Sequence, residues 1–289
     1  AKVKSALERN FTLSKVQITG PFVNLKFENR DFAEFVLGDI HEPSYFNRAS
    51  VPGKIMVEFS QPNTHKEFHI GHLRNVSIGD ALVRTLRAAG RNVIAANYFG
   101  DVGTHIAKCL WAYTQANSPP PPHQNVSQFF GEFYKKAYDL YEESDEVKKE
   151  VGKILHAVET RKEPWYSLWK TTRDLCLKDF EKIYDYLGVK FDHLFYESDC
   201  DQLGQELVNE FLAKKVFVES EGAIICDLNE DKLGACLVRK SDGTSLYATK
   251  DLALAKLKFE QFDINESIYV VGAEQIRHFK QVFKTLEKM

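Results

Sequence analysis

The amino-acid sequence predicts an α/β fold: a Rossmann-like parallel sheet with a helical insertion and a short N-terminal appendage. Residues 54–60 (KIMVEFS) and 93–99 (VIAANYF) are short apolar runs typical of buried strands. Between them, residues 71–89 carry apolar side chains at helical spacing, and Gly90 ends the helix. Strand, helix and strand in this order form a β-α-β unit, whose crossover is right-handed and whose strands are parallel.

The middle of the chain predicts the insertion, at about residues 118–190. Ser118 is followed by four prolines, which cannot be helical and mark its start. Residues 126–187 have a helical pattern without strand signals, and another helix is expected to begin near Gly103. After the insertion we expect strands at 189–196, 216–219, 223–228, 237–239 and 267–271, with helices from about Thr249 and at the end of the chain.

The N-terminal residues predict a small separate part. Residues 13–27 alternate apolar and polar positions on both sides of Gly20-Pro21, which predicts two strands and a turn. Residues 38–53 contain Pro43 and Pro52 and are expected to be a linker. We therefore expect an appendage with its linker at 1–50 and the main domain at 51–289.

Composition excludes several classes of protein. The 289 residues contain no apolar run near the ~20 residues of a membrane span, so no membrane association is expected. Five cysteines without a C-x-x-C pair suggest neither disulfides nor a zinc site. The N-terminus resembles no signal or transit peptide, which predicts the cytoplasm. A net charge of −3 argues against extensive nucleic-acid coating but allows a local basic patch.

One motif carries the chemistry, within FSQPNTHKEFHIGHLRN (residues 59–75). His69 and His72 lie between a strand and a helix, at the carboxyl edge of the sheet, where open α/β folds bind ligands. Three residues apart, both imidazoles face one side of the first helical turn and can donate to a phosphate, which the helix N-terminus also favours. Gly71 lets a ligand approach the backbone, and the nearby Lys66 agrees with a nucleotide site. Alternatively, the histidines only bond the loop.

Five segments then carry a resemblance: VEFSQPN, KEFHIGHLRN, ANYFGDVG, RKSDGTSLYATKD and VVGAEQIRHFKQVF. In this order they resemble segments of arginyl-tRNA synthetases, a family of class I aminoacyl-tRNA synthetases, over about residues 55–283. The H-I-G-H motif alone would indicate class I or a related nucleotidyltransferase, whereas the later segments indicate arginine.

The resemblance implies an arginine–tRNA ligase, whose partners are arginine, ATP and tRNA(Arg), without DNA. ATP would bring Mg²⁺ as a substrate complex, and no protein-bound metal is implied. The implied catalytic residues are His69, His72 and Lys66. The implied ATP-binding residues are His69, Gly71, His72, Gly272 and His278. The implied arginine-binding residues are Glu58, Ser60, Asn63, Tyr247, Asp251 and Gln275. Carboxylates suit a guanidinium, and Tyr247 and Asp251, four apart at a helix start, can face one pocket.

Each of these assignments has a simpler alternative. Glu58 could face solvent from a strand, Asp251 could cap a helix and Tyr247 could be a core aromatic, while Gln275 and His278 could belong to a solvated helix face.

The sequence departs from the family in three respects. The second class I signature, K-M-S-K-S or a variant, and the C-terminal anticodon-binding helices are not found before Met289. The appendage, which contacts the tRNA elbow in relatives, matches only in its last part. We therefore expect a catalytic-domain piece that binds arginine or ATP weakly and aminoacylates poorly alone.

Two other functions remain open at this stage. One is a noncatalytic tRNA-binding or assembly subunit derived from a synthetase. The other is a small H-x-G-H nucleotidyltransferase, which would have no guanidinium to bind. A dinucleotide dehydrogenase is disfavoured, since no G-x-G-x-x-G follows the first strand.

Overall fold

The computed structural model describes residues 13–42, 45, 50–241, 243–244 and 246–289. The chain divides into two compact units. The first ends at Val51 and includes residues 88–90, and the second comprises Pro52–Arg87 and Arg91–Met289.

The first unit contains a hairpin and a helix. Strands β1 (Leu13–Thr19) and β2 (Phe22–Phe27) pair antiparallel, as the sequence predicts. Helix α2 (Asn29–His41) was not predicted, and the proposed linker at 38–53 is wrong at both ends. Residues 38–41 continue α2, because apolar side chains at Phe32, Phe35 and Ile40 follow a helical period that tolerates Gly38. Residues 51–53 belong to the next strand, and Pro43 lies outside the described residues.

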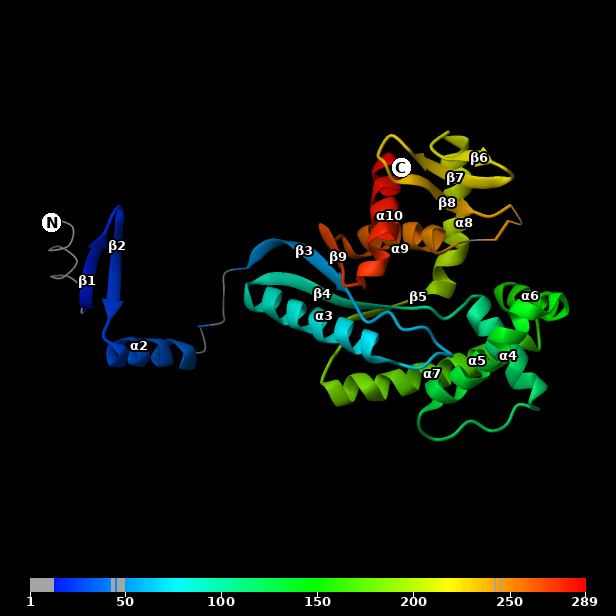
Figure 1. The fold of residues 1–289 in the computed structure, drawn as a ribbon, viewed down its shortest axis with the longest axis horizontal. Coiled ribbons are helices and arrows are strands. Elements are labelled where there is room, and N and C mark those ends of the chain that lie inside the picture. Colours follow the sequence, from blue (N-terminus) through cyan, green and yellow to red (C-terminus); the bar gives the residue numbers. More distant parts are fainter. Residues whose placement is uncertain (1–12, 43–44, 46–49, 242, 245) are drawn as a thin grey trace. The chain divides into compact units, whose positions relative to one another are not determined.

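A four-stranded parallel sheet forms the centre of the second unit (Figure 1). Its strands are β3 (Val51–Glu58), β4 (Arg91–Phe99), β5 (His193–Tyr196) and β9 (Glu266–Tyr269), in the order β5-β4-β3-β9. Helix α3 (Ile70–Ala88) connects β3 to β4, so the predicted β-α-β unit and the α/β fold class are confirmed. Strand β5 is shorter than predicted, since the chain enters it only at His193.

Helix α3 packs closely against β3. Val76 and Val83 of α3 are buried with Val57 and Phe59 in one apolar cluster. Gly79 faces the same cluster, and a Cβ atom there would lie 2.1 Å from Cγ of Phe59. A glycine is therefore required where helix α3 packs against Phe59, the residue that directly follows β3.

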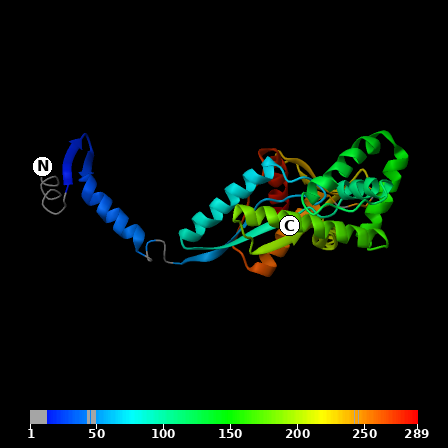
Figure 2. The same cartoon turned by 90° about the horizontal axis from the view of Figure 1, so that it is seen from below.

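The predicted insertion is helical, as expected. It contains α5 (Val126–Glu143), α6 (Asp145–Glu159) and α7 (Trp165–Leu187), which pack with the preceding α4 (Thr104–Gln115). Figure 2 shows α4, α5 and α6 together at one end of the unit, while α7 runs back along the sheet. Phe130 and Trp169 are buried in the two apolar clusters that hold these helices together.

The remaining elements, from residue 197 to the end of the chain, are helices and a small antiparallel sheet. Helix α8 (Glu197–Ala213) leads to an antiparallel sheet of β6 (Val218–Ser220), β7 (Ala223–Leu228) and β8 (Gly234–Arg239). Then follow α9 (Tyr247–Phe262), a short 3₁₀ turn, η1 (Ala273–Gln275), and α10 (Ile276–Lys288). Among the described residues, no helix has the length and apolar character that crossing a membrane requires.

Candidate functional site

An acidic pocket of about 340 Å³ lies at the carboxyl ends of β3 and β4. Segments far apart in the sequence contribute its lining: Glu58, Gln61, Asn63, Tyr98, Gly100, Glu197, Tyr247, Asp251, Glu274, Gln275, His278 and Phe279. Ligands bind in open α/β folds at this edge of the sheet, because the loops that follow the parallel strands meet there.

Glu58 forms a buried ion pair at the base of the pocket. Its Oε2 atom lies 2.5 Å from Nζ of Lys258, and both side chains are almost completely buried. Its Oε1 atom accepts a hydrogen bond of 2.6 Å from Nε2 of Gln61. Burial alone would lower the pKa of Lys258, but the adjacent Glu58 raises it above its ordinary value. Glu58 is therefore a buried acceptor held by two partners and not a solvent-facing strand residue.

Two further carboxylates of the pocket also have partners. Glu197 Oε1 lies 2.9 Å from Nζ of Lys250, and Asp251 Oδ2 lies 2.5 Å from Nε2 of His278. Burial raises the pKa of Asp251, while the contact with His278 acts in the opposite direction. Burial likewise raises the pKa of Glu197, against the influence of Lys250. Acidic groups gathered in this way favour a ligand with positive charge.

The pocket brings together most of the residues that the sequence associates with arginine. Glu58, Asn63, Tyr247, Asp251 and Gln275 all line it. Ser60 does not line it.

Ser60 is instead buried beside the pocket, with its hydroxyl 2.7 Å from that of Tyr184. Asn63 forms a backbone bridge with Gly100, which joins the loop after β3 to the end of β4.

The two motif histidines stack on each other. Their ring centroids are 3.9 Å apart, with 25° between the planes. Nδ1 of His69 accepts from the Gly71 amide at 3.1 Å, and Nδ1 of His72 accepts from the His69 amide at 3.2 Å. Burial, with His69 and Lys66 nearby, lowers the pKa of His72 to about 4. At neutral pH, His72 is therefore uncharged with its proton on Nε2, where it can donate to an anion.

Of the residues predicted for the nucleotide site and catalysis, only one lines the acidic pocket. His278 lines the pocket, whereas His69, His72, Gly71, Lys66 and Gly272 do not. A Cβ atom at Gly71 would lie 2.9 Å from Cε1 of His69, so this glycine leaves room for the histidine ring. Nζ of Lys66 lies 4.8 Å from the ring centre of Tyr134, and burial together with Lys108 lowers its pKa.

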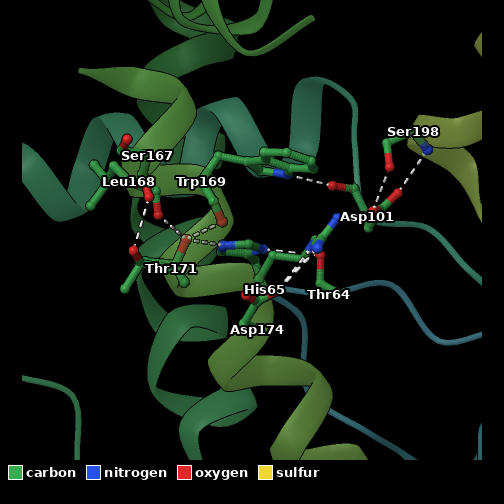
Figure 3. A network of polar contacts seen from close by, with 11 residues as sticks. Thr64, His65, Asp101, Ser167, Leu168, Trp169, Thr171, Asp174 and Ser198 are labelled. Atoms are coloured by element: carbon green, nitrogen blue, oxygen red, sulfur yellow. Dashed lines mark hydrogen bonds and ion pairs between the residues drawn. The ribbon is translucent and has the colours of Figure 1, made fainter. Parts of the chain in front are cut away.

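The loop that connects the pocket to the histidines is strained and held by a buried network (Figure 3). Ser60, Gln61 and His65 all have positive φ, of 79°, 52° and 59°. The fully buried His65 contacts the Thr64 hydroxyl through Nδ1, at 3.1 Å, and that of Thr172 through Nε2, at 2.8 Å. Burial lowers the pKa of His65 to about 3, so it stays neutral. His65 thus fastens the loop to helix α7 of the insertion.

Asp101 extends this network from the end of β4. Its carbonyl oxygen accepts from Nε1 of Trp169 at 2.6 Å. Its carboxylate accepts from the backbone and hydroxyl of Ser198, at 2.8 and 2.7 Å, and so caps the start of α8. Arg173 lies 3.2 Å from the same carboxylate. Figure 3 shows Asp101 between Trp169 and Ser198, to one side of His65. They connect α7 and α8 to the strand end that lines the pocket.

Comparison with known proteins identifies the family. The model for "tRNA synthetases class I (R), catalytic domain" matches residues 40–289. The chain belongs to this family. This confirms the resemblance drawn from the five sequence segments and extends it beyond residues 55–283.

The curated relatives are named as arginine–tRNA ligases. The one from Bdellovibrio bacteriovorus is 43% identical over 276 residues, which cover 93% of this chain and 48% of that protein. The one from Halothermothrix orenii is 36% identical over 291 residues, covering 100% and 51%. The chain thus spans about half the length of the curated relatives it matches.

Solved structures show the same fold. Arginyl-tRNA synthetase from Plasmodium falciparum matches with a TM-score of 0.71 and 21% identity, over 100% of this chain and 52% of that one. Arginyl-tRNA synthetase from Thermus thermophilus matches with a TM-score of 0.61 and 23% identity, over 89% and 44%. At these identities the similarity establishes the architecture alone.

Sequence reasoning missed half of the pocket lining: Gln61, Tyr98, Gly100, Glu197, Glu274 and Phe279. All but Glu197 lie within segments that were already recognised. Glu197 has no motif around it, but it directly follows β5, at the same carboxyl edge, so the topology could have indicated it.

No metal centre is evident within the described part of the chain, where no group of three or more histidine, cysteine, aspartate or glutamate side chains could hold an ion. All five cysteines are free and buried.

Proposed function

We propose that this chain is the catalytic portion of an arginine–tRNA ligase. It activates arginine with ATP and transfers the arginyl group to tRNA(Arg). The observation that carries the proposal is the acidic pocket at the carboxyl edge of the parallel sheet, where Glu58 of β3 and Asp251 of α9 line one cavity. Membership of the class I (R) synthetase family supports it.

The pocket chemistry suits the arginine side chain. A guanidinium stays charged at all physiological pH values and presents five N–H donors in a plane. Asp251 and Glu58 supply carboxylate acceptors, and Tyr247 at the start of α9 lines the same cavity. Asn63 and Gln275 supply neutral polar groups for the α-ammonium and α-carboxylate, together with Ser60 of the same loop as Asn63. A lysine ammonium lacks the planar arrangement and would leave buried acceptors unpaired, which disfavours it.

Activation requires the arginine carboxylate to attack the α-phosphorus of ATP. A carboxylate oxygen forms the new P–O bond, and pyrophosphate leaves with the electrons of the bond that breaks. His69 and His72 donate from Nε2 to the phosphate oxygens as their negative charge grows, and Lys66 contacts the leaving pyrophosphate. Gly71, Gly272 and His278 complete the nucleotide site. Mg²⁺ arrives with ATP as part of the substrate.

Transfer follows on the tRNA. A ribose hydroxyl of the 3'-terminal adenosine attacks the arginyl carbonyl carbon, and AMP leaves. In this proposal residues 51–289 form the catalytic domain, and residues 1–50 contact the tRNA elbow. The protein works in the cytoplasm, without DNA or a membrane as partner.

Arginine-dependent ATP–pyrophosphate exchange, with and without tRNA(Arg), tests the proposal. The Asp251→Asn variant should lose exchange at arginine concentrations that saturate the wild type. Asp227→Asn, at an exposed position of β7 outside the pocket, should behave as wild type. Exchange that does not depend on arginine, or that is unchanged in Asp251→Asn, would contradict the proposal.

A further inference from the structure

Tyr98 lines the acidic pocket, and its hydroxyl has no hydrogen-bond partner in the described part of the chain. The residue lies near the end of β4, and its Oη atom is buried without a hydrogen bond among the residues that the structure describes. The nearby Tyr184 differs, because its hydroxyl contacts Ser60 at 2.7 Å and Asn97 at 3.0 Å. Only one of these two buried hydroxyls is therefore satisfied by the protein itself.

A buried hydroxyl without a partner destabilises a fold, and native proteins rarely contain one without a reason. The acidic residues around Tyr98 indicate that a cationic ligand supplies the missing partner. Burial raises the pKa of the Tyr98 phenol most, and the nearby Cys200, Glu197, Asp251 and Glu58 raise it further, in that order. Tyr98 therefore remains a neutral phenol, which can accept one hydrogen bond while it donates another.

Most of the oxygens of Glu58, Asp251 and Glu197 already contact other side chains of the protein. Both oxygens of Glu58 already contact Gln61 and Lys258. One oxygen of Asp251 contacts His278, and one oxygen of Glu197 contacts Lys250. In the described chain, Oδ1 of Asp251 and Oε2 of Glu197 are the carboxylate oxygens of these three residues that make no such contact. These two oxygens can accept at most four hydrogen bonds, so at least one of the five N–H groups of a guanidinium is left for another acceptor of the pocket, and Tyr98 lines the same cavity.

We propose that Tyr98 is a specificity-determining residue of the arginine pocket, whose hydroxyl accepts an N–H of the substrate guanidinium. This inference rests on the proposed function and adds a neutral acceptor to the carboxylates. The bond forms only when the substrate fills the pocket, so Tyr98 contributes to binding and not to folding. An ammonium has three donors on a tetrahedral nitrogen and cannot reach both carboxylates and the phenol in one plane.

The test is the Tyr98→Phe variant, studied in the 289-residue chain by calorimetric titration with arginine, titration with ATP, and thermal unfolding without ligand. The dissociation constant for arginine should rise about tenfold, and the constant for ATP should not change. The unfolding temperature should stay the same or rise, because the change removes an unpaired buried hydroxyl and keeps the ring.

Tyr113→Phe is the matched control. The Tyr113 hydroxyl donates to the Pro119 carbonyl at 2.9 Å, away from the pocket, so its loss should lower the unfolding temperature and leave arginine binding unchanged. Arginine binding by Tyr98→Phe at wild-type strength, or an equal loss for arginine and ATP, would overturn the inference alone. A wild-type chain that binds no arginine would overturn the proposed function and this inference with it.

Discussion

The buried ion pair between Lys258 and Glu58 predicts a large loss of stability when one partner is removed. Lys258→Met keeps much of the side-chain volume but leaves the Glu58 carboxylate buried and unpaired. At 2.5 Å the two charges attract by about 7 kcal/mol for an effective dielectric constant of ~20. Desolvation costs several kcal/mol per ion and offsets most of this, so the intact pair adds little net stability.

Removal of the lysine alone does not recover that desolvation cost. We therefore expect Lys258→Met to lower the free energy of unfolding by about 3–5 kcal/mol. A typical domain has about 5–15 kcal/mol in total, so the loss should be conspicuous. The double variant with Glu58→Gln should recover a substantial part, because the unpaired charge is gone.

Urea unfolding followed by circular dichroism measures these differences. Lys214→Met is the matched control, because Lys214 and Glu210 are also 2.5 Å apart but lie on the surface, where water screens the pair and its loss should change the free energy of unfolding little. The raised pKa of Lys258 also predicts how stability depends on pH. The stabilisation of the folded state by Lys258 is complete below the unfolded-state pKa of about 10.4, and it is lost as pH rises through the higher folded-state pKa. If Lys258→Met and Lys214→Met lose the same free energy of unfolding, the reasoning is refuted.

Three further predictions concern the elements that hold the loop. Thr172→Val should cost about 1–3 kcal/mol in urea unfolding, since it leaves Nε2 of His65 buried without a partner; an unchanged midpoint would show that the network does not hold the loop. The pKa of His65, about 3, lies below its unfolded value, so this residue's contribution to stability should be complete above pH 6.5 and decline as pH falls toward 3; His65→Gln should flatten that decline, and a parallel curve would contradict the assignment. Gly79→Ala should destabilise by about 1–3 kcal/mol, because its Cβ would overlap Phe59, and wild-type stability would mean that α3 shifts without cost.

The fold was predictable where apolar spacing is regular. The run before Glu58 and the helical spacing that follows indicated the β-α-β unit, and buried residues on both elements confirm why. Helix α2 was not predicted, because Gly38 inside it and the nearby Pro43 are residues typical of a linker. The shortening of β5 also escaped prediction, because strand ends depend on pairing with β4 that a local pattern does not contain.

The site was predictable only through its motifs. Glu58 and Asp251 are 193 positions apart, and family resemblance rather than spacing placed them in one pocket. The cations that hold the carboxylates, Lys258 and Lys250, could not be identified, because a lysine in a helical pattern is usually an exposed residue. The unpaired hydroxyl of Tyr98 is a property of three-dimensional packing and leaves no trace in sequence.

The most direct test of the central claim is a crystal structure of this chain with arginine and a non-hydrolysable ATP analogue. The guanidinium should lie in the acidic pocket, about 3 Å from a carboxylate oxygen of Asp251, with the phosphates near Nε2 of His69 and His72. Arginine bound elsewhere, with the pocket between Glu58 and Asp251 holding only solvent, would contradict the account.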